Sequence, residues 1–567
     1  MDQLSSRLSA VNRLIDVASG RSPADLVLKD VVYVNVFSQE LLRGDIAIVG
    51  DRIAGIGSYH GRCEKHLDGI VCPGFTDAHI HLESSLAAPS EFARAVIPHG
   101  TTCVVTDPHE ITNVMGTDGI CYMLQATKGL PLDVFFMLPS CVPATPLDES
   151  GALLDWYAID PFYQDERVLG LAEMMNAFGV VHKDDVALRK IIDARAHGKR
   201  IDGHAPGLHG LGLNAYIAAG VASDHECSML DEAMEKLRLG QYIMIRDGTA
   251  ARNLEALSPL LNGTTAQRCL LCTDDKHPND LLEKGHVDYI LRKAVSFGAD
   301  PLAAVTAATR NAAQYFGLSE RGAVAPGYLA DLTVVDNLEE FNVRSVYKHG
   351  KVIFDGTLLP FSVPVVEPEL QEKALDTFHV AHIRKEDFRP NGSQAIIGMI
   401  PGQIISTNNG RADHPDPEQD ILRIAVIERH KSTGHIGLGY IQGYGLKHGA
   451  VATSISHDSH NIIVVGSDEA DMAAAVDQIL ADRGGIAVVD GGFTIAAVPL
   501  EIAGLMSDTD LNVLNEKLEH AKYAAHALGV NPGIDPFMTL SFMSLPVIPS
   551  LRLTTRGMVD VETQQLV

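Results

Sequence analysis

Residues 73–85 read Pro73-Gly-Phe-Thr-Asp-Ala-His79-Ile-His81-Leu-Glu-Ser-Ser85 and contain the histidine pair that decides the fold. Pro73 and Gly74 predict a turn, and the apolar residues after them predict a short β-strand. Side chains alternate between the two faces of a strand, so His79 and His81 should project from the same face. Two adjacent imidazoles form half of a divalent metal site. They could instead be strand histidines bonded to backbone, but residues elsewhere in the chain favour the metal site.

The chain that follows alternates apolar, strand-like runs with helical stretches, which is typical of a parallel α/β sheet. We expect eight strands, with runs that end at His81, Asp107, Ser140, Glu173, His204, His225, Arg246 and Asp274. Eight strands with interleaved helices predict a (β/α)8 barrel, whose active site lies at the carboxyl ends of the strands. Four of the runs end in a His or a Glu and the last in an Asp, so candidate ligands gather at one end of the barrel.

Two β-rich blocks flank this region. Residues 26–58 and 330–354 consist of short apolar runs separated by turn residues such as Gly50-Asp51 and His349-Gly350. We expect both blocks to pair into one small β-sandwich, into which the barrel is inserted. A proline-rich linker near residue 362 should lead to a separate C-terminal α+β domain. The expected domains are a composite β-sandwich of residues 1–72 and 318–362, a catalytic barrel of residues 73–317 and a C-terminal domain of residues 363–567.

Composition limits the classes of partner. The 567 residues carry a net charge of −27, which argues against nucleic acid or an anionic membrane surface because both would repel the protein. The first residues lack the apolar core of a secretion signal, and no apolar run reaches membrane-spanning length. Eight cysteines in so long a chain are no disulfide framework, so we expect reduced thiols and a cytoplasmic location. A homo-oligomer is compatible with these properties.

Further candidate ligands stand at the ends of the later strands. Glu173 ends a buried apolar run, where a carboxylate needs a partner; it could pair with a barrel arginine or bridge two metal ions. His204 and His225 each occur where a strand becomes a loop, and this shared position favours metal ligation over ordinary loop histidines. Asp274 could both coordinate metal and move protons. Its neighbour Asp275 is either a site residue, or a helix-capping acid or a partner in a structural salt bridge.

This constellation resembles the amidohydrolase superfamily, which combines His-x-His on strand 1, a bridging acid on strand 4, histidines on strands 5 and 6 and an aspartate on strand 8. The resemblance covers roughly residues 26–356. It implies two divalent metal ions, with Mn2+ or Fe2+ favoured and Zn2+ compatible with the ligands. The implied metal ligands are His79, His81, Glu173, His204, His225 and Asp274. Many members bridge their metals with a carboxylated lysine, and Glu173 takes that place here.

Longer motifs narrow the resemblance to the adenine deaminase family. They are His79-Ile-His-Leu-Glu-Ser-Ser85, Thr106-Asp-Pro-His-Glu-Ile111, Gly203-His-Ala-Pro-Gly207, Cys272-Thr-Asp-Asp-Lys-His-Pro278, His457-Asp-Ser-His-Asn461 and Ile502-Ala-Gly-Leu-Met-Ser507. The resemblance implies hydrolytic deamination of adenine to hypoxanthine and ammonia, a reaction of purine salvage. Glu501 departs from the apolar or proline residue expected at its position, which concerns local C-terminal geometry and not the metal centre.

The chemistry follows from these ligands. A divalent metal lowers the pKa of bound water from 15.7 to about 7 and so supplies hydroxide for attack on C6 of adenine. Asp274 would take the hydroxide proton and pass it to the departing amino group. The ring nitrogen beside C6 must also gain a proton, and Glu83 is a candidate donor, although it could instead orient a ligand histidine. The resemblance adds candidate substrate-binding residues, which are His109, Glu110, Asp275, His277, His457 and His460.

Other interpretations remain open. His457 and His460 could belong to a lid or to a further metal site. The barrel ligands alone also permit hydrolysis of another cyclic amide or amidine, or N-acyl deacetylation. A metal-stabilised scaffold without turnover would lack a water-accessible coordination position. The zinc deaminases of nucleobases use H-x-E with P-C-x-x-C, but here Arg268 stands where the proline should be. No basic cluster appears at the strand ends, which favours a free base over a nucleotide substrate.

Overall fold

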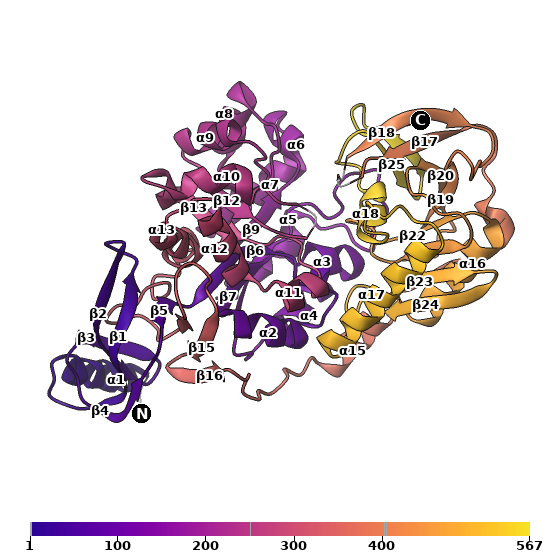
Figure 1. The fold of residues 1–567 in the computed structure, drawn as a ribbon. Coiled ribbons are helices and arrows are strands. Elements are labelled where there is room, and N and C mark those ends of the chain that lie inside the picture. Colours follow the sequence, from indigo (N-terminus) through magenta and orange to yellow (C-terminus); the bar gives the residue numbers. More distant parts are fainter. Residues whose placement is uncertain (1–2, 250, 402, 404) are drawn as a thin grey trace.

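The computed structural model describes residues 3–249, 251–401, 403 and 405–567. Three units follow one another in Figure 1: a β-rich unit that contains the N-terminal segment, a central barrel, and a C-terminal domain drawn in orange to yellow. The N-terminus lies in the first unit and the C-terminus in the last. The barrel therefore lies between the β-rich unit and the C-terminal domain.

Eight parallel strands form the barrel. They are β6 (Phe75–Ile80), β7 (Thr101–Thr106), β8 (Asp133–Leu138), β9 (Val168–Met174), β10 (Arg200–Gly203), β11 (Ser223–Asp224), β12 (Tyr242–Arg246) and β13 (Cys269–Cys272). β6 to β10 pair in chain order, and so do β11 to β13. A parallel bridge between Ile80 and Asp274 joins β13 to β6, and Ala222 donates a backbone hydrogen bond to Ile201 at 2.9 Å between β11 and β10. The predicted barrel is confirmed, with each strand ending within two residues of its expected position.

Helices follow the strands around the outside of the barrel. The α-helices are α2 (Pro89–Val96), α3 (His109–Met115), α4 (Thr117–Ala126), α5 (Trp156–Ile159), α6 (Ala177–Val181), α7 (Asp185–Ala196), α8 (Gly210–Ala219), α9 (Leu230–Arg238), α10 (Leu254–Leu257), α11 (Pro278–Glu283), α12 (Val287–Ser296), α13 (Pro301–Thr306) and α14 (Ala312–Tyr315). A π-helical segment, Ala307–Asn311, joins α13 to α14. Asp300 caps α13 by accepting hydrogen bonds from the Leu302 and Ala303 amides.

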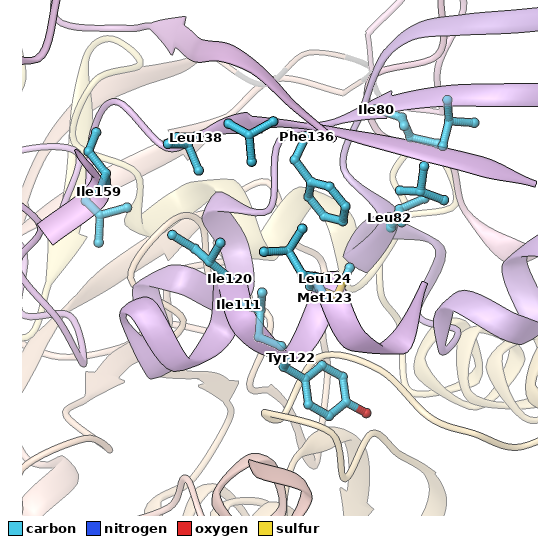
Figure 2. Packing of buried hydrophobic residues seen from close by; sticks show 14 of the residues in the cluster. Ile80, Leu82, Ile111, Ile120, Tyr122, Met123, Leu124, Phe136, Leu138 and Ile159 are labelled. Atoms are coloured by element: carbon cyan, nitrogen blue, oxygen red, sulfur yellow. The ribbon is translucent and has the colours of Figure 1, made fainter. Parts of the chain in front are cut away.

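The core between strands and helices determines which way the histidines point. Figure 2 shows Phe136 of β8 directed at helices α3 and α4, with Ile80 and Leu82 in the same apolar cluster. Because strand side chains alternate, the outward position of Ile80 turns His79 and His81 towards the barrel interior. Fully burying an aliphatic side chain contributes about 1.5–3 kcal/mol, so the register of β6 is strongly fixed.

Strands from both flanks of the barrel share one eight-stranded sheet. The N-terminal flank supplies β1 (Ala24–Asn35), β2 (Glu40–Val49), β3 (Arg52–Gly57), β4 (Gly61–His66) and β5 (Ile70–Pro73), and the later flank supplies β14 (Leu332–Val335), β15 (Val343–Lys348) and β16 (Lys351–Asp355). β5 pairs with β14, so the two flanks meet at that point. Helix α1 (Gln3–Ala18), which has no counterpart among the expected elements, packs beside β2 and β3. The exact domain boundaries stay a prediction.

The C-terminal domain is built on a second eight-stranded sheet. Its strands are β17 (Gln394–Met399), β18 (Ser406–Ala412), β19 (Leu422–Ile427), β20 (Ile436–Gln442), β21 (Ala450–Thr453), β22 (Ile462–Gly466), β23 (Gly485–Asp490) and β24 (Phe493–Pro499). The remaining elements are α15 (Pro368–Leu375), α16 (Glu469–Ala481), α17 (Leu511–Ala527), α18 (Met538–Ser541), β25 (Leu551–Thr554), β26 (Gly557–Asp560) and β27 (Gln565–Leu566).

The barrel and the C-terminal domain share apolar cores. Leu86 and Ala87, from the loop after β6, are buried in the main C-terminal cluster. In return, residues 502–506 join the barrel cluster, and the Ser507 amide donates to the Leu86 carbonyl at 2.8 Å. The C-terminal domain is therefore fixed against the loop that carries the first predicted metal ligands. Within the described residues, none of the helices combines the length and apolar character that crossing a membrane requires.

Candidate metal centre

The two histidines of β6 lie side by side at the carboxyl end of the barrel. Their ring centroids are 4.8 Å apart, and both side chains are almost fully buried. The Nδ1 atom of His81 is 3.0 Å from the Asp107 carbonyl oxygen, so Nδ1 carries the hydrogen and donates it. This arrangement leaves Nε2 of His81 with a free lone pair, as a metal ligand needs.

Glu173, at the end of β9, lies between two pairs of histidines. Its Oε1 atom is 3.3 Å from Nε2 of His81 and 3.9 Å from Nε2 of His79. Its Oε2 atom is 2.7 Å from Nδ1 of His204 and 3.2 Å from Nε2 of His225. Each carboxylate oxygen thus faces one of these pairs, and Nδ1 of His109 lies 3.7 Å from Oε1 as well. This is the position that a carboxylate bridging two cations would need.

Asp274 completes the group from the end of β13. Its Oδ1 atom is 3.1 Å from Nε2 of His81 and 3.4 Å from Nε2 of His79. The residue has φ of +60°, a left-handed conformation that is uncommon outside glycine and turns the chain away after the strand. The structure therefore brings together all six residues that the sequence suggests as ligands.

These side chains fit divalent metal. Nε2 of His79 is buried and has no hydrogen-bond partner among the described residues, and an orphaned ring nitrogen of this kind suits a cation. Subsets of the six lie close enough to share an ion, such as His79 with Glu173 and His225. Imidazole with carboxylate ligands suits Zn, Mn or Fe and does not select among them.

Both carboxylates are held in the ionised form. Burial opposes ionisation of Glu173, but the neighbouring imidazoles of His204, His225 and His81 outweigh it and keep the pKa of Glu173 well below its usual value. Burial likewise opposes ionisation of Asp274, and the Arg246 charge, followed by His79 and His81, holds its pKa well below the usual value. Two anions at the centre of four imidazoles favour a bound dication.

A cavity of about 380 Å³ opens beside this group. One wall comes from the barrel and is polar, with His81, Glu173, His204 and Asp274 among its members. The opposite wall comes from the C-terminal domain and is mainly apolar. Its apolar residues are Ile405, Phe542, Leu545, Val547, Ile548 and Pro549. A small, flat molecule placed here would contact candidate metal ligands on one side and hydrocarbon on the other.

Comparison with known proteins agrees with this geometry. Residues 70–353 match the amidohydrolase family, and residues 403–565 match the adenine deaminase C-terminal domain. Adenine deaminase from Desulfatibacillum aliphaticivorans is 47% identical, with 97% of this chain and 98% of that protein covered. Adenine deaminase 2 from Carboxydothermus hydrogenoformans is 45% identical over 99% of both chains. The chain belongs to the adenine deaminase family.

A solved structure, that of β-aspartyl dipeptidase from Fervidobacterium islandicum AW-1, aligns with a TM-score of 0.46 at 16% identity and covers 59% of this chain and 99% of its own. As a member of the adenine deaminase family, the chain is a hydrolase of the amidohydrolase type. Its clustered imidazoles and carboxylates form a site for divalent metal.

Glu83 lies close to this adenine deaminase-type centre but does not line the cavity. It is 2% exposed, its Oε1 atom accepts a 3.2 Å hydrogen bond from the Ile111 amide, and its Oε2 atom has no partner among the described residues. Burial, assisted by the nearby Glu110, raises the pKa of Glu83 to about 7. The side chain is therefore able to hold a proton near neutral pH.

The structure distributes the remaining candidate residues over three places. His109, Glu110, Asp275 and His457 line the cavity. His277 instead lines a second cavity of about 30 Å³, which also touches Asp275 and His457. His460 is not among the described residues that line the cavity. Its Nε2 atom contacts the Glu110 carboxylate. The Asp275 carboxylate accepts a hydrogen bond from the Ser84 hydroxyl. This contact is neither the helix cap nor the salt bridge that the sequence suggests for Asp275.

Two residues in the centre are missing from the sequence-based assignment. Arg246 is 2.5 Å from Oδ2 of Asp274 and also pairs with Glu226. Glu226 is 3.6 Å from Nδ1 of His204 and 3.5 Å from Nε2 of His225. The sequence does place both residues at strand ends, because Arg246 ends the seventh strand and Glu226 follows His225 directly. Their pairing required the folded barrel.

Proposed function

We propose that this chain catalyses the hydrolytic deamination of adenine to hypoxanthine and ammonia. The observation that carries the proposal is Glu173, whose two carboxylate oxygens each face a pair of histidines beside the cavity. Relatives that share 44–47% identity over nearly the whole chain carry the name adenine deaminase, which supports the choice of substrate. Hydrolysis of another cyclic amide or amidine, or N-acyl deacetylation, is disfavoured because the likeness extends through the C-terminal domain.

The six clustered residues would hold two divalent cations, with Mn2+ or Fe2+ favoured. His79 and His81 face one carboxylate oxygen of Glu173 and also Oδ1 of Asp274, and His204 and His225 face the other oxygen of Glu173. When bound, such ions supply Lewis-acid charge that lowers the pKa of a coordinated water from 15.7 to about 7. The protein's own residues must then orient adenine and move protons.

Asp274 is proposed to carry the proton to the leaving group. Its carboxylate is ionised, lines the cavity and lies at the end of a rigid strand, so it can accept a proton from the attacking water. Arg246, at 2.5 Å from Oδ2, fixes the orientation of the carboxylate and favours its ionised form before catalysis. The acid formed in this way can then protonate the departing amine.

Glu83 is proposed to hold the proton that the purine ring nitrogen acquires. Its pKa of about 7 keeps a fraction of the carboxyl groups protonated at neutral pH, and its unpartnered Oε2 atom could carry the proton. Because Glu83 does not line the cavity, the proton would reach the purine through an intervening group. The alternative role is to orient His81 from two residues along the chain. The substrate roles of His109, Glu110, Asp275, His277, His457 and His460 also stay predictions.

The cavity supports a free base as substrate. Among the described residues that line it, Arg246 is the one permanent cation, and it is already paired with Asp274 and Glu226. A phosphate group would therefore find no unpaired arginine or lysine there. The apolar wall, which includes Phe542 and Ile548, suits the faces of a purine ring. A cytoplasmic location and a homo-oligomeric state remain predictions from the sequence.

The test couples metal analysis to ammonia release from adenine, for the purified wild type and for Glu173→Gln and Asp274→Asn. We expect Glu173→Gln to lower the metal content and abolish turnover, because it removes the charge between the two ligand groups. Asp274→Asn should reduce kcat by roughly 10²–10⁴ even with metal in excess. Asp185→Asn, at an exposed site where Asp185 pairs with Arg189, is the matched control. Wild-type turnover by Glu173→Gln, or a loss in Asp185→Asn as large as that in Asp274→Asn, would contradict these roles.

A further inference from the structure

A second group of histidines and a carboxylate spans the interface between the barrel and the C-terminal domain. Glu110 comes from α3, and His457 and His460 come from the loop between β21 and β22. Nδ1 of His457 is 2.8 Å from Oε1 of Glu110, and Nε2 of His460 contacts Oε2 of the same carboxylate. All three side chains are buried, with relative exposures of 2%, 8% and 0%. None of them is among the six proposed metal ligands.

Hydrogen bonds around His460 assign its protonation. The Ser456 amide donates to Nδ1 of His460 at 3.3 Å, so this nitrogen holds a lone pair. In the neutral ring the hydrogen then lies on Nε2, which donates to Glu110. A metal ion on Nε2 would force the hydrogen onto Nδ1, against the Ser456 amide. The cluster is therefore better described as a carboxylate that accepts two N–H donors than as a third cation site.

The backbone holds His460 firmly in this position. The Arg429 guanidinium donates to the His460 carbonyl and, at 2.9 Å, to the Ala503 carbonyl. The Arg429 amide donates to the side chain of Asn461 at 3.2 Å. A fully buried arginine thus fixes the loop that carries both histidines. His460 and Glu110 form a rigid support, and His457 stands on the side of it that faces the cavity.

The second ring nitrogen of His457 is available to a ligand. Its Nδ1 atom is engaged by Glu110, and no hydrogen bond to Nε2 is found among the described residues; His457 lines the cavity of about 380 Å³ and also the one of about 30 Å³. Phe542 stacks on the ring, with centroids 4.6 Å apart and an interplanar angle of 21°. The ring can therefore neither rotate freely nor withdraw, and Nε2 is its one uncommitted polar atom.

We infer that His457 donates a hydrogen bond from Nε2 to a ring nitrogen of the purine, and that Glu110 and His460 are the residues that position it. This inference rests on the proposed function. The charge state agrees with the geometry. Burial alone would lower the pKa of His457, but Glu110 raises it to about 9, whereas burial keeps the pKa of His460 at about 4 despite Glu110. His457 is then an imidazolium that carries hydrogens on both nitrogens.

The inference gives the C-terminal domain a part in substrate recognition. Among the described residues of its cavity wall, His457 and Asp458 are the ones with ionisable side chains. A charged donor on the wall opposite the proposed metal ligands would fix the in-plane orientation of a purine, which apolar packing alone does not. It would also disfavour rings that lack an acceptor nitrogen at that edge, because the buried donor would lose its partner.

The test compares adenine with 3-deazaadenine and 7-deazaadenine, each of which lacks one acceptor nitrogen. His457→Leu should lower kcat/KM for adenine by roughly 10- to 100-fold, the range for a hydrogen bond from a charged donor. It should also lose most of the wild-type discrimination against one of the two analogues. His457→Gln, which can still present an N–H, should recover part of both losses. His448→Leu, on the exposed surface of the same domain, is the control.

A double-substitution cycle tests the positioning role. Glu110→Gln should lower kcat/KM for adenine in the wild-type background but cause little further loss in His457→Leu, because both changes remove the same interaction. Unchanged discrimination in His457→Leu, or full additivity of the two changes, would overturn the inference. So would the loss of one metal equivalent per chain in His457→Leu, since this would make the cluster a cation site. If the wild type releases no ammonia from adenine, it is the proposed function that fails.

Discussion

The two walls of the cavity differ in the chemistry of the side chains that line them. The barrel wall consists of imidazoles and carboxylates at the ends of strands, whereas the C-terminal wall is mainly the apolar segment 542–549 together with Ile405. Strands such as β6 and β13 are hydrogen-bonded on both sides and hold their side chains rigidly. Much of segment 542–549 lies outside regular structure. The reactive groups thus have fixed positions, while water exclusion and shape come from a separate domain.

Among the substitutions that test this difference between the barrel and the C-terminal wall, the largest loss of activity is expected at Glu83, in the barrel. Glu83→Gln removes the proposed proton donor, so kcat for adenine should fall by roughly 10²–10⁴ while the metal content stays at the wild-type level. The protonated form is the active one, and burial raises the pKa of Glu83 to about 7. Activity of the wild type should therefore decline as pH rises through about 7, and this decline should be absent in the variant.

Glu91→Gln is the matched control for Glu83, because it makes the same change eight residues along in α2, where Glu91 pairs with Arg94 at 3.0 Å. It should leave both kcat and the pH profile unaltered. If Glu83→Gln lost metal in proportion to activity, the carboxyl would be supporting a ligand histidine instead of transferring a proton. The steady-state rate and the metal content measured on the same preparation decide between these roles.

The barrel wall could be predicted from the sequence because its information is local. His79 and His81 are two residues apart on a strand, so their shared face follows from strand geometry. Glu173, His204 and His225 each end an apolar run, and parallel strands place such ends together. The same reasoning could not place His277. β13 ends at Cys272 and the chain then turns, so that His277 becomes the N-cap of α11 and faces a different cavity.

The C-terminal wall could not be predicted, because it depends on how two domains dock. Phe542 and Val547 are more than 260 residues from Asp274, the last of the barrel ligands in the chain. Apolar residues near a helix end are equally compatible with an ordinary core, and only the folded chain places them across the cavity. The contact between Glu110 and His460 is of the same kind: each residue stood out in its own motif, but nothing in the sequence paired them.

An intermediate effect is expected at Phe542, on the apolar wall. If this wall contacts the purine ring, Phe542→Ala should remove aromatic contact worth about 1–3 kcal/mol, release the His457 ring that Phe542 stacks on, and lower kcat/KM for adenine by roughly 5- to 150-fold. Most of the loss should appear in KM, because the ring makes this contact before and during the reaction. Phe493→Ala, at a site that is 77% exposed in the same domain, should have no effect. If Phe542→Ala and Phe493→Ala had the same kcat/KM for adenine, the apolar wall would not contribute to substrate binding.

The smallest effect is expected where the two domains meet, in the barrel loop around residue 148. Lys431 donates to the Ser150 carbonyl at 2.9 Å and Asn461 to the Glu149 carbonyl at 2.7 Å, so this loop attaches to the C-terminal domain. Asp148 is 6% exposed, and its Oδ2 atom has no hydrogen-bond partner among the described residues. Burial, followed by the nearby Asp458 carboxylate, raises the pKa of Asp148 well above its usual value.

The sign of the resulting pH dependence follows from proton binding. The unfolded chain releases the Asp148 proton near pH 4, whereas the folded chain keeps it to higher pH. The contribution of Asp148 to stability is therefore complete below about pH 4 and is lost as the pH rises through the folded value. Asp148→Asn carries no such proton, so its free energy of unfolding should exceed that of the wild type by about 1 kcal/mol at pH 8 and by less at pH 5. Urea unfolding at the two pH values measures this difference, with Asp68→Asn, 91% exposed, as the control. A difference that did not grow with pH would mean that the junction tolerates the carboxylate charge, and the two domains would then be attached through a wetter interface than the burial of Asp148 indicates.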